Sequence, residues 1–200
     1  METTLHLMRH GSIEGCEIRR FRGQADVPLD DAGRRQAAWW RERLGTGRFT
    51  AVYASDLSRT METARIVTGG DTPIIAEPRL REISLGTWEG RTPQEVMREE
   101  PEAYAARGRD ITRYRTPGGE SFEDLQNRTW PAFEDIARAA GGEILIVCHG
   151  GVIRTLLCRI LGMPLENLFR IILDYAGLNI IVRKENGLAL AAMNLTPPRA

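Results

Sequence analysis

The stretch "EILIVC" at residues 143–148 is the clearest strand of this 200-residue chain and decides its fold class. Its apolar run is nearly continuous and rich in β-branched residues, which is typical of a strand covered on both faces. Helical patterns flank it at residues 121–140 and 150–161. A buried strand between two helices favours an α/β protein with a mostly parallel sheet.

The same alternation extends toward both ends of the chain. Further strands are expected at residues 5–8, 51–54 and 74–76. One further helix is expected from a cap at Asp30 or Asp31 to Leu44, where Gly45 stops it. Others are expected at residues 58–67, ended by Gly69-Gly70, and from Thr92-Pro93 onward. The segment 178–194 is typical of a hairpin turned by Asn186-Gly187, which adds an antiparallel edge strand. We therefore predict a three-layer α/β/α sandwich with a mostly parallel sheet, built as a single domain over residues 1–200.

The composition argues against several classes of function. Positive and negative side chains balance at 27 each, so neither a nucleic-acid-binding surface nor an acidic tail is indicated. No apolar run is long enough to cross a membrane, and the N-terminus lacks a signal-peptide pattern. The three cysteines, Cys16, Cys148 and Cys158, form no CxxC pair, and their odd number suits a reducing compartment. We expect a cytoplasmic protein without nucleic-acid or membrane partners, and the sequence leaves a homodimer open.

Two of the three histidines are followed by glycine, and both stand where a predicted strand ends. His10-Gly11 follows the first strand, and His149-Gly150 follows the strand at 143–148. Ligands of open parallel sheets bind beyond the carboxyl ends of the strands, so the two pairs mark an expected site. His6 lies within the first strand and is interpreted as structural.

Imidazoles could serve such a site as metal ligands or as nucleophiles. Arg9 stands next to His10 and counts against a metal, because its charge would repel the ion. It suits phosphoryl transfer, where fixed cationic donors stabilise the charge on the phosphate oxygens. A guanidinium also donates two parallel hydrogen bonds to a phosphate. We therefore favour phosphoryl transfer over a metal site at this point, and we expect no cofactor.

A second arginine is offered by "YASDLSRTMETA" at residues 53–64. Arg59 falls in the first turn of the predicted helix, where free N–H groups and the helix dipole favour anions. Taken alone it would be interpreted as a surface residue. In the company of Arg9 and the two His-Gly pairs, we interpret it as a phosphate ligand.

An acid is also needed, because an alkoxide leaves poorly without a proton. The segment "LREISLGTWEG" at residues 80–90 offers Glu82, which is flanked by Leu80 and Ile83. Desolvation would raise the pKa of this carboxyl group, whereas nearby cations would lower it. Glu89 is the competing acid, and we favour Glu82.

Six segments of the chain together resemble the histidine phosphatase superfamily, also called the phosphoglycerate mutase-like family. They are "LMRHG", "RFRGQADVPLDDAGRRQA", "YASDLSRTMETA", "LREISLGTWEG", "GGESFEDLQNR" and "IVCHGG", in the family's order between residues 5 and 151. The resemblance implies the three-layer fold, no metal, and a phosphohistidine intermediate. It covers about three quarters of the chain.

The resemblance also implies roles for individual residues. His10 would be the nucleophile, and Arg9, Arg59 and His149 would form the phosphate pocket. Glu82 would donate a proton to the leaving group and later act as the base for water. Five further residues would line the pocket or contact the substrate: Gly11, Gly23 and Gly150 through their backbone, and Arg22 and Gln24 through their side chains.

Two positions depart from the family's common pattern. Ser12 stands where relatives often carry glutamate after RHG, and Cys16 stands where they carry asparagine. If that asparagine contacts phosphate in relatives, the contact is missing here or is supplied by another group. The nucleophile, the acid and the arginines are all present, which favours an active enzyme.

Hydrolysis is favoured over the mutase alternative. Related mutases are longer and carry a basic insertion after the glutamate, whereas residues 91–112 here are short, helical and rich in glutamate. We expect this acidic lid to hold a bisphosphorylated intermediate poorly. A third hypothesis is a non-catalytic module that binds a phosphorylated ligand, but such a module would commonly lack the nucleophile or the acid.

The expected partner is a small phosphorylated metabolite. The segments "RFRGQADVPLDDAGRRQA" and "PGGESFEDLQNR" look most like the α-ribazole phosphatase branch, which removes the 5′-phosphate of a cobalamin precursor. Broad-specificity sugar phosphatases and fructose-2,6-bisphosphatase-like members share these motifs. Trp88, Tyr104 and Tyr114 could stack on an aromatic substrate, but core packing is the commoner role of such residues.

Overall fold

One mixed sheet organises the residues that the computed structural model describes, 3–139 and 141–198. Its strands are β1 (Thr3–Arg9), β2 (Ala51–Ala54), β3 (Ile74–Ala76), β4 (Gly142–Cys148), β5 (Leu178–Lys184) and β6 (Gly187–Leu195), in the order β3-β2-β4-β1-β5-β6. The first four are mutually parallel, and β5 and β6 are antiparallel to their neighbours. The predicted sheet with its antiparallel edge is confirmed.

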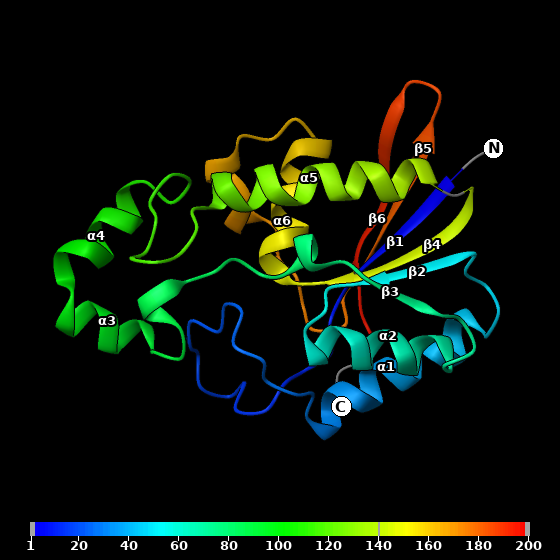
Figure 1. The fold of residues 1–200 in the computed structure, drawn as a ribbon, viewed down its shortest axis with the longest axis horizontal. Coiled ribbons are helices and arrows are strands. Elements are labelled where there is room, and N and C mark those ends of the chain that lie inside the picture. Colours follow the sequence, from blue (N-terminus) through cyan, green and yellow to red (C-terminus); the bar gives the residue numbers. More distant parts are fainter. Residues whose placement is uncertain (1–2, 140, 199–200) are drawn as a thin grey trace.

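Helices cover both faces of the sheet and complete the three layers (Figure 1). The α1 (Asp31–Leu44) and α2 (Ser58–Thr68) helices lie on one face, and α5 (Phe122–Ala139) and α6 (Gly150–Ile160) lie on the other. Strand β4 packs against the helices on both faces of the sheet, because its side chains alternate between the two faces. Ile144 and Ile146 pack on the α5–α6 side, while Leu145 and Val147 pack on the α1–α2 side, and all four are fully buried.

Local signals set most helix ends as the sequence predicts. The Asp30 side chain accepts a hydrogen bond from the Gly33 N–H and so caps α1, and Gly45 ends that helix. Gly69 ends α2 in the left-handed conformation. The predicted helix at 121–140 is α5, whose expected last residue, Ala140, lies outside the described residues.

The helix start expected at Thr92-Pro93 is confirmed, with Thr92 as the cap of α3 (Pro93–Glu99). A second helix, α4 (Pro101–Arg109), follows at once, because Pro101 cannot donate a backbone hydrogen bond and so begins a new helix. One local prediction needs correction. The hairpin turn is Glu185-Asn186 rather than Asn186-Gly187, since Gly187 already pairs with Lys184 in the ladder.

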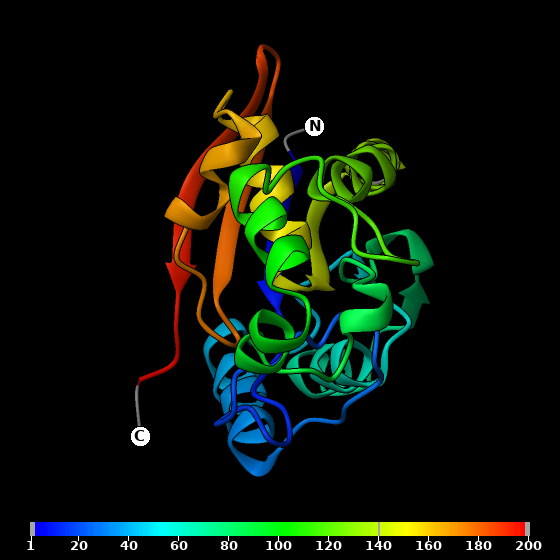
Figure 2. The same ribbon diagram turned by 90° about the vertical axis from the view of Figure 1, so that its left-hand side faces the viewer.

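The α3 and α4 helices stand beyond the carboxyl ends of the parallel strands, away from the two helical layers (Figures 1 and 2). Trp88 holds this outlying lid together. Its ring is fully buried and lies 5.3 Å from the Phe21 ring, 6.3 Å from Tyr104 and 6.0 Å from Tyr114, measured between ring centroids. These aromatic residues extend the core of the α5–α6 side of the sheet into the lid. No helix in the described residues is long and apolar enough to cross a membrane.

Candidate active site

His10 immediately follows β1 and is held there by backbone and side-chain hydrogen bonds. Its N–H donates to the Cys148 carbonyl at the end of β4, at 3.1 Å. Its side-chain Nδ1 lies 2.7 Å from the Gly11 carbonyl oxygen. A carbonyl only accepts, so Nδ1 carries the proton and the lone pair of the neutral ring lies on Nε2. The imidazole is 5% exposed.

The surroundings of His10 keep its imidazole neutral. Burial lowers the pKa of His10 well below its usual value, and the positive charges of Arg9 and Arg59 lower it further. A neutral imidazole has the free lone pair that a nucleophile needs. The fold thus prepares His10 for attack through Nε2.

His149 lies beside His10 at the start of α6, with 5.2 Å between the ring centroids. Arg59 Nε donates to His149 Nδ1 at 3.4 Å, which leaves the proton of the neutral ring on Nε2. That nitrogen lies 2.9 Å from Ser55 Oγ, at the end of β2. Burial, followed by the charge of Arg59, lowers the pKa of His149 well below its usual value. Both ring nitrogens therefore already have partners.

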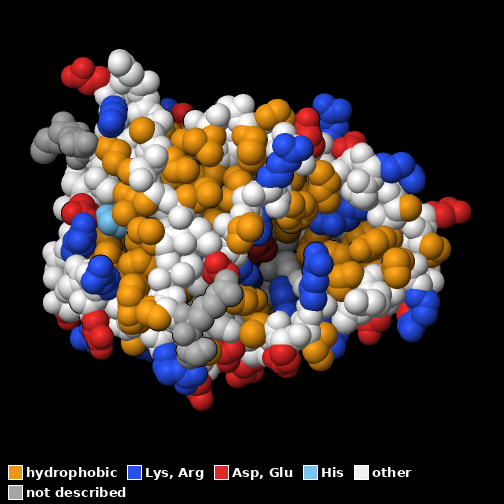
Figure 3. All heavy atoms as spheres, turned by 180° about the vertical axis from the view of Figure 1, so that it is seen from behind, with side chains coloured by type: hydrophobic (Ala, Val, Ile, Leu, Met, Phe, Trp, Pro, Cys, Tyr) orange, Lys and Arg blue, Asp and Glu red, His pale blue; other side chains and the backbone are white. Residues whose placement is uncertain are grey.

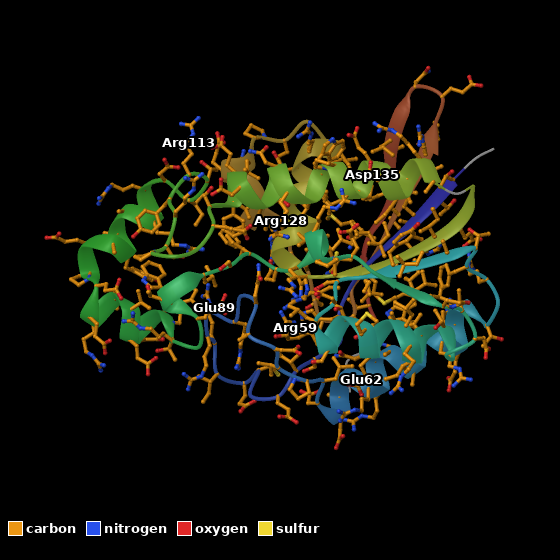
Figure 4. The ribbon with its side chains drawn as sticks, in the orientation of Figure 1. Arg59, Glu62, Glu89, Arg113, Arg128 and Asp135 are labelled. Carbon is orange, nitrogen blue, oxygen red and sulfur yellow. The ribbon has the colours of Figure 1, made fainter. Side chains whose placement is uncertain are left out.

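Arg59 is almost completely buried, at 2% exposure, near the N-terminal end of α2 (Figure 4). Its Nη1 donates to the Ala25 carbonyl at 2.7 Å, and its Nη2 donates to the Gly23 carbonyl at 2.9 Å. With Nε on His149, three of the five guanidinium N–H groups are used, and two remain for a ligand. Arg59 thus joins the loop at 23–25 to His149.

Arg9 also belongs to the site, and its Nε is a donor without a partner among the described residues. Its Nη1 donates to the Leu173 carbonyl at 2.7 Å, and its guanidinium lies 3.9 Å from the centre of the Tyr175 ring. Its Nε is buried without a hydrogen-bond partner in the described part of the chain. Such a group is costly unless a ligand or water completes it. Tyr175 also lies 5.6 Å from His10, between ring centroids, and sequence reasoning missed it.

Glu82 supplies the carboxylate of the site. Its Oε2 accepts a hydrogen bond from the Gly151 N–H, at 2.9 Å, and its Oε1 accepts one from the Ile83 N–H, also at 2.9 Å. The first contact fixes the carboxylate at the N-terminal end of α6, one residue from the His149-Gly150 pair. The competing acid, Glu89, accepts instead from the Gln24 and Leu85 N–H groups and does not line the pocket.

A cavity of about 340 Å³ opens beside these groups. Its lining includes Arg9, Glu82, Gly151 and Tyr175 from the site, and the loop at 18–23 and the lid helix α4 from its outer side. Figure 3 shows this face of the molecule hollowed, with blue and orange side chains around the hollow. A small phosphorylated molecule fits a cavity of this volume.

The remaining predicted site residues lie in or next to the cavity. Arg22 and Gly23 line the cavity, and Gly150 packs beside Arg9 and Arg154. The Gln24 side chain donates to the Glu82 backbone carbonyl at 3.0 Å, so it supports the acid. Gly11 was also predicted to line the pocket with its backbone, but its N–H is engaged within the protein.

Gly11 is needed for close packing against helix α1. Its N–H donates to Thr63 Oγ1 at 3.1 Å, so this donor is not free for a phosphate. A Cβ on Gly11 would lie 2.6 Å from the Gly33 carbonyl oxygen. The sequence contains the other glycine of this contact, Gly33, but only the fold shows that Gly11 and Gly33 meet.

The two departures from the family's pattern form one network. Ser12 Oγ donates to Asp30 Oδ2 at 2.7 Å and lies 3.2 Å from Cys16 Sγ. Asp30 is also the cap of α1. Ser12 thus joins the loop after His10 to the helix, and Cys16 occupies the edge of the cavity.

Arg128 on α5 is a further residue that sequence reasoning missed. It donates to the backbone carbonyls of Arg79, Arg81 and Glu82, and it forms two hydrogen bonds with the Glu120 carboxylate. Glu120 in turn accepts from the Ser84 N–H at 2.9 Å. This pair attaches the segment that carries Glu82 to α5. In contrast, Arg113 points outward from the lid (Figure 4).

The fold and the paired histidines with their arginines define the class of protein. Residues 5–196 match the model of the histidine phosphatase superfamily, branch 1, and the chain belongs to this family. The resemblance seen in the sequence is thereby confirmed.

Individual relatives place the chain among phosphatases and mutase-like proteins. Phosphoglycerate mutase-like protein 4 of Arabidopsis thaliana is 40% identical over 155 residues, which are 75% of this chain and 67% of that protein. The glucosyl-3-phosphoglycerate phosphatase of Mycolicibacterium vanbaalenii is 37% identical over 174 residues, 82% of this chain and 76% of that protein. The solved structure of the α-ribazole phosphatase of Shigella flexneri has a TM-score of 0.89 at 29% identity and covers 96% of both chains.

Proposed function

We propose that this protein is a phosphomonoester hydrolase that works without a metal, through a phosphohistidine formed on His10. One observation carries the proposal most directly. The hydrogen bond from His10 Nδ1 to the Gly11 carbonyl leaves the lone pair on Nε2 of a buried, neutral ring. Cationic donors surround that ring, as the charge of a transferring phosphoryl group requires.

The first step transfers the phosphoryl group to the protein. The His10 Nε2 lone pair attacks phosphorus, and the bond between phosphorus and the ester oxygen breaks. The protonated Glu82 carboxyl group gives its proton to that oxygen, so the product leaves as an alcohol. Arg9 and Arg59 donate hydrogen bonds to the phosphoryl oxygens, and His149 keeps Arg59 in position through its Nδ1.

The second step returns the protein to its starting state. The Glu82 carboxylate takes a proton from water, and the water oxygen attacks phosphorus. The bond between phosphorus and Nε2 breaks, inorganic phosphate leaves, and His10 is again neutral. Glu82 is now protonated for the next cycle.

Hydrolysis suits the open site better than a mutase reaction does. A mutase must keep water away from its phosphohistidine, whereas a hydrolase must admit it. The lid of this chain is two short helices beside an open cavity. The mutase-like relative keeps phosphoryl transfer as the second candidate, and its reaction would share the first step.

The substrate is proposed to be a small phosphorylated metabolite in the cytoplasm. The likeness to an α-ribazole phosphatase supports α-ribazole 5′-phosphate as one candidate. The likeness to a glucosyl-3-phosphoglycerate phosphatase supports a phosphorylated acid as another.

The experiment compares p-nitrophenyl phosphate hydrolysis by the wild type and His10→Ala, with EDTA present. We expect metal-independent hydrolysis that His10→Ala abolishes. Activity that survives the substitution would refute the nucleophile, and activity lost in EDTA would refute the metal-free reaction.

A further inference from the structure

Cations greatly outnumber anions in the lining of the cavity. Six arginines line it, Arg9, Arg19, Arg20, Arg22, Arg107 and Arg154, and Glu82 is the one carboxylate among the described lining residues. Arg9 and the more deeply placed Arg59 already supply the positive charge at the phosphate end of the site. The outer end therefore carries more positive charge than a single phosphate group requires.

Arg107, on α4, is the most unusual of these arginines. Its guanidinium lies 5.5 Å from the centre of the Phe21 ring and 5.8 Å from that of Phe122, so two aromatic rings hold it at the cavity wall. The side chain is half-buried, and no carboxylate pairs with it in the described part of the chain. A partly desolvated cation without a counter-charge is costly until an anion arrives.

No glutamate of the lid pairs with Arg107 in the described residues, and three of the four lie beside other arginines. Glu99 and Glu100 pair with Arg91, and Glu95 lies 3.9 Å from Arg20. The expectation of an acidic lid therefore needs correction. Three of its four glutamates lie beside other arginines, Glu102 is exposed on the surface, and the residue that α4 contributes to the cavity is a cation.

Arg19 reinforces the charge at the same place. It also lines the cavity, and no hydrogen bond or ion pair engages its guanidinium within the described ranges. Burial is the main cause that lowers the pKa of Arg107, and the positive charge of Arg19 contributes in the same direction. Two neighbouring cations that face one cavity repel each other. An anion bound between them would be attracted to both and would offset this repulsion.

We propose that Arg107, with Arg19, binds a second anionic group of the substrate at the outer end of the cavity. The preferred substrates are then phosphomonoesters that also carry a carboxylate or a second phosphate. The proposal rests on the proposed hydrolase function, which it deepens. Arg107 is a specificity-determining residue in this account, and Phe21 and Phe122 position it.

The test uses pairs of substrates that differ in the second charge alone. In 3-phosphoglycerate a carboxylate replaces a hydroxymethyl group of glycerol 3-phosphate, and fructose 1,6-bisphosphate adds a phosphate to fructose 6-phosphate. We expect kcat/KM to favour one doubly anionic member by about tenfold or more, the effect of a charge-assisted hydrogen bond. The pair with the larger ratio identifies the anion. Equal kcat/KM values within both pairs would overturn the proposal.

Arg107→Gln should bring the favoured ratio down toward one, mainly through a higher KM for the doubly anionic substrate. The matched control is Arg109→Gln, which changes an exposed arginine two residues further along α4 and should keep the wild-type ratio. An Arg107→Gln variant that loses activity on both members equally would show a merely structural role and overturn the proposal.

Calorimetric titration of His10→Ala separates this proposal from the proposed function. Tighter binding of the doubly anionic member, lost on adding Arg107→Gln, would support the second-anion site even if no ester were hydrolysed. Equal binding of both members of each pair would overturn it even if p-nitrophenyl phosphate were hydrolysed normally.

Discussion

The carboxylate of Glu82 lies directly against Gly151, and the missing side chain of this glycine makes the contact possible. The Gly151 N–H donates to Glu82 Oε2 at 2.9 Å, and a Cβ at position 151 would lie only 2.2 Å from Oε1. The second glycine of the HGG segment therefore determines where the proposed acid stands. Sequence reasoning assigned the pocket to the first glycine, Gly150.

Gly151→Ala should lower activity without unfolding the protein. The new methyl group would meet the far end of the flexible Glu82 side chain, which can move away. Alanine also suits a helix better than glycine by about 0.5–1 kcal/mol, so the free energy of unfolding should be retained. We expect kcat on alkyl phosphates to fall on the order of tenfold or more, the scale of a displaced general acid. Gly108→Ala, where a Cβ meets nothing within 4 Å, is the control, and equal kcat values for the two variants would contradict this role of Gly151.

Glu82→Gln should affect substrates according to their leaving groups. Glutamine cannot supply the proton, so kcat on an alkyl phosphate should fall by about 10²–10⁴. The p-nitrophenolate ion leaves without protonation, so the first step with p-nitrophenyl phosphate should be much less affected. Burst kinetics separate that step from the later hydrolysis of the intermediate. An equal loss in the first step for both esters would argue against Glu82 as the acid.

Arg59→Ala should lower kcat/KM by about 10²–10³, the scale expected when a fixed donor to a developing charge is lost. The substitution also releases the loop whose carbonyls, those of Gly23 and Ala25, receive its hydrogen bonds. Arg59→Lys keeps the charge but not the planar fork, so it should restore only part of the activity. Arg65→Ala changes an exposed residue of the same helix and serves as the control. Unchanged turnover in Arg59→Ala would refute a phosphate role.

The free energy of unfolding should fall as the pH drops below about 6.5, the ordinary pKa of histidine. Burial holds the pKa values of His10 and His149 well below that value in the folded chain. The unfolded chain therefore takes up protons that the folded chain does not, and each histidine lowers stability by as much as about 1.4 kcal/mol per pH unit. Urea denaturation between about pH 7.5 and 5.5 measures this slope, which His10→Gln should reduce. A slope identical in that variant and the wild type would contradict a neutral, buried His10.

The sequence was informative where local signals decide structure. The strand at 143–148 could be predicted because its apolar run admits few other structures, and the caps at Asp30 and Gly69 act over one helical turn. The histidines and Arg59 could be assigned to one site because the carboxyl ends of parallel strands share one edge of the sheet.

Contacts between distant segments were beyond the reach of the sequence. The attachment of Glu82 to α5 through Arg128 joins residues 46 positions apart, and Tyr175 reaches Arg9 from a segment far along the chain. No periodic pattern marks such contacts. The charge of the lid was misjudged for a related reason. Counting glutamates cannot show that three of the four lie beside Arg91 or Arg20 while Arg107 faces the cavity.

The central claim is that His10 carries the phosphoryl group between the two steps. It is tested most directly by mixing Glu82→Gln with p-nitrophenyl phosphate, quenching in alkali, and mapping the modified peptide by mass spectrometry. The account predicts one phosphoryl group on His10, which accumulates because the variant lacks the base that activates water. Steady hydrolysis by the wild type with no phosphoryl group found on His10, in either the wild type or the variant, would contradict it.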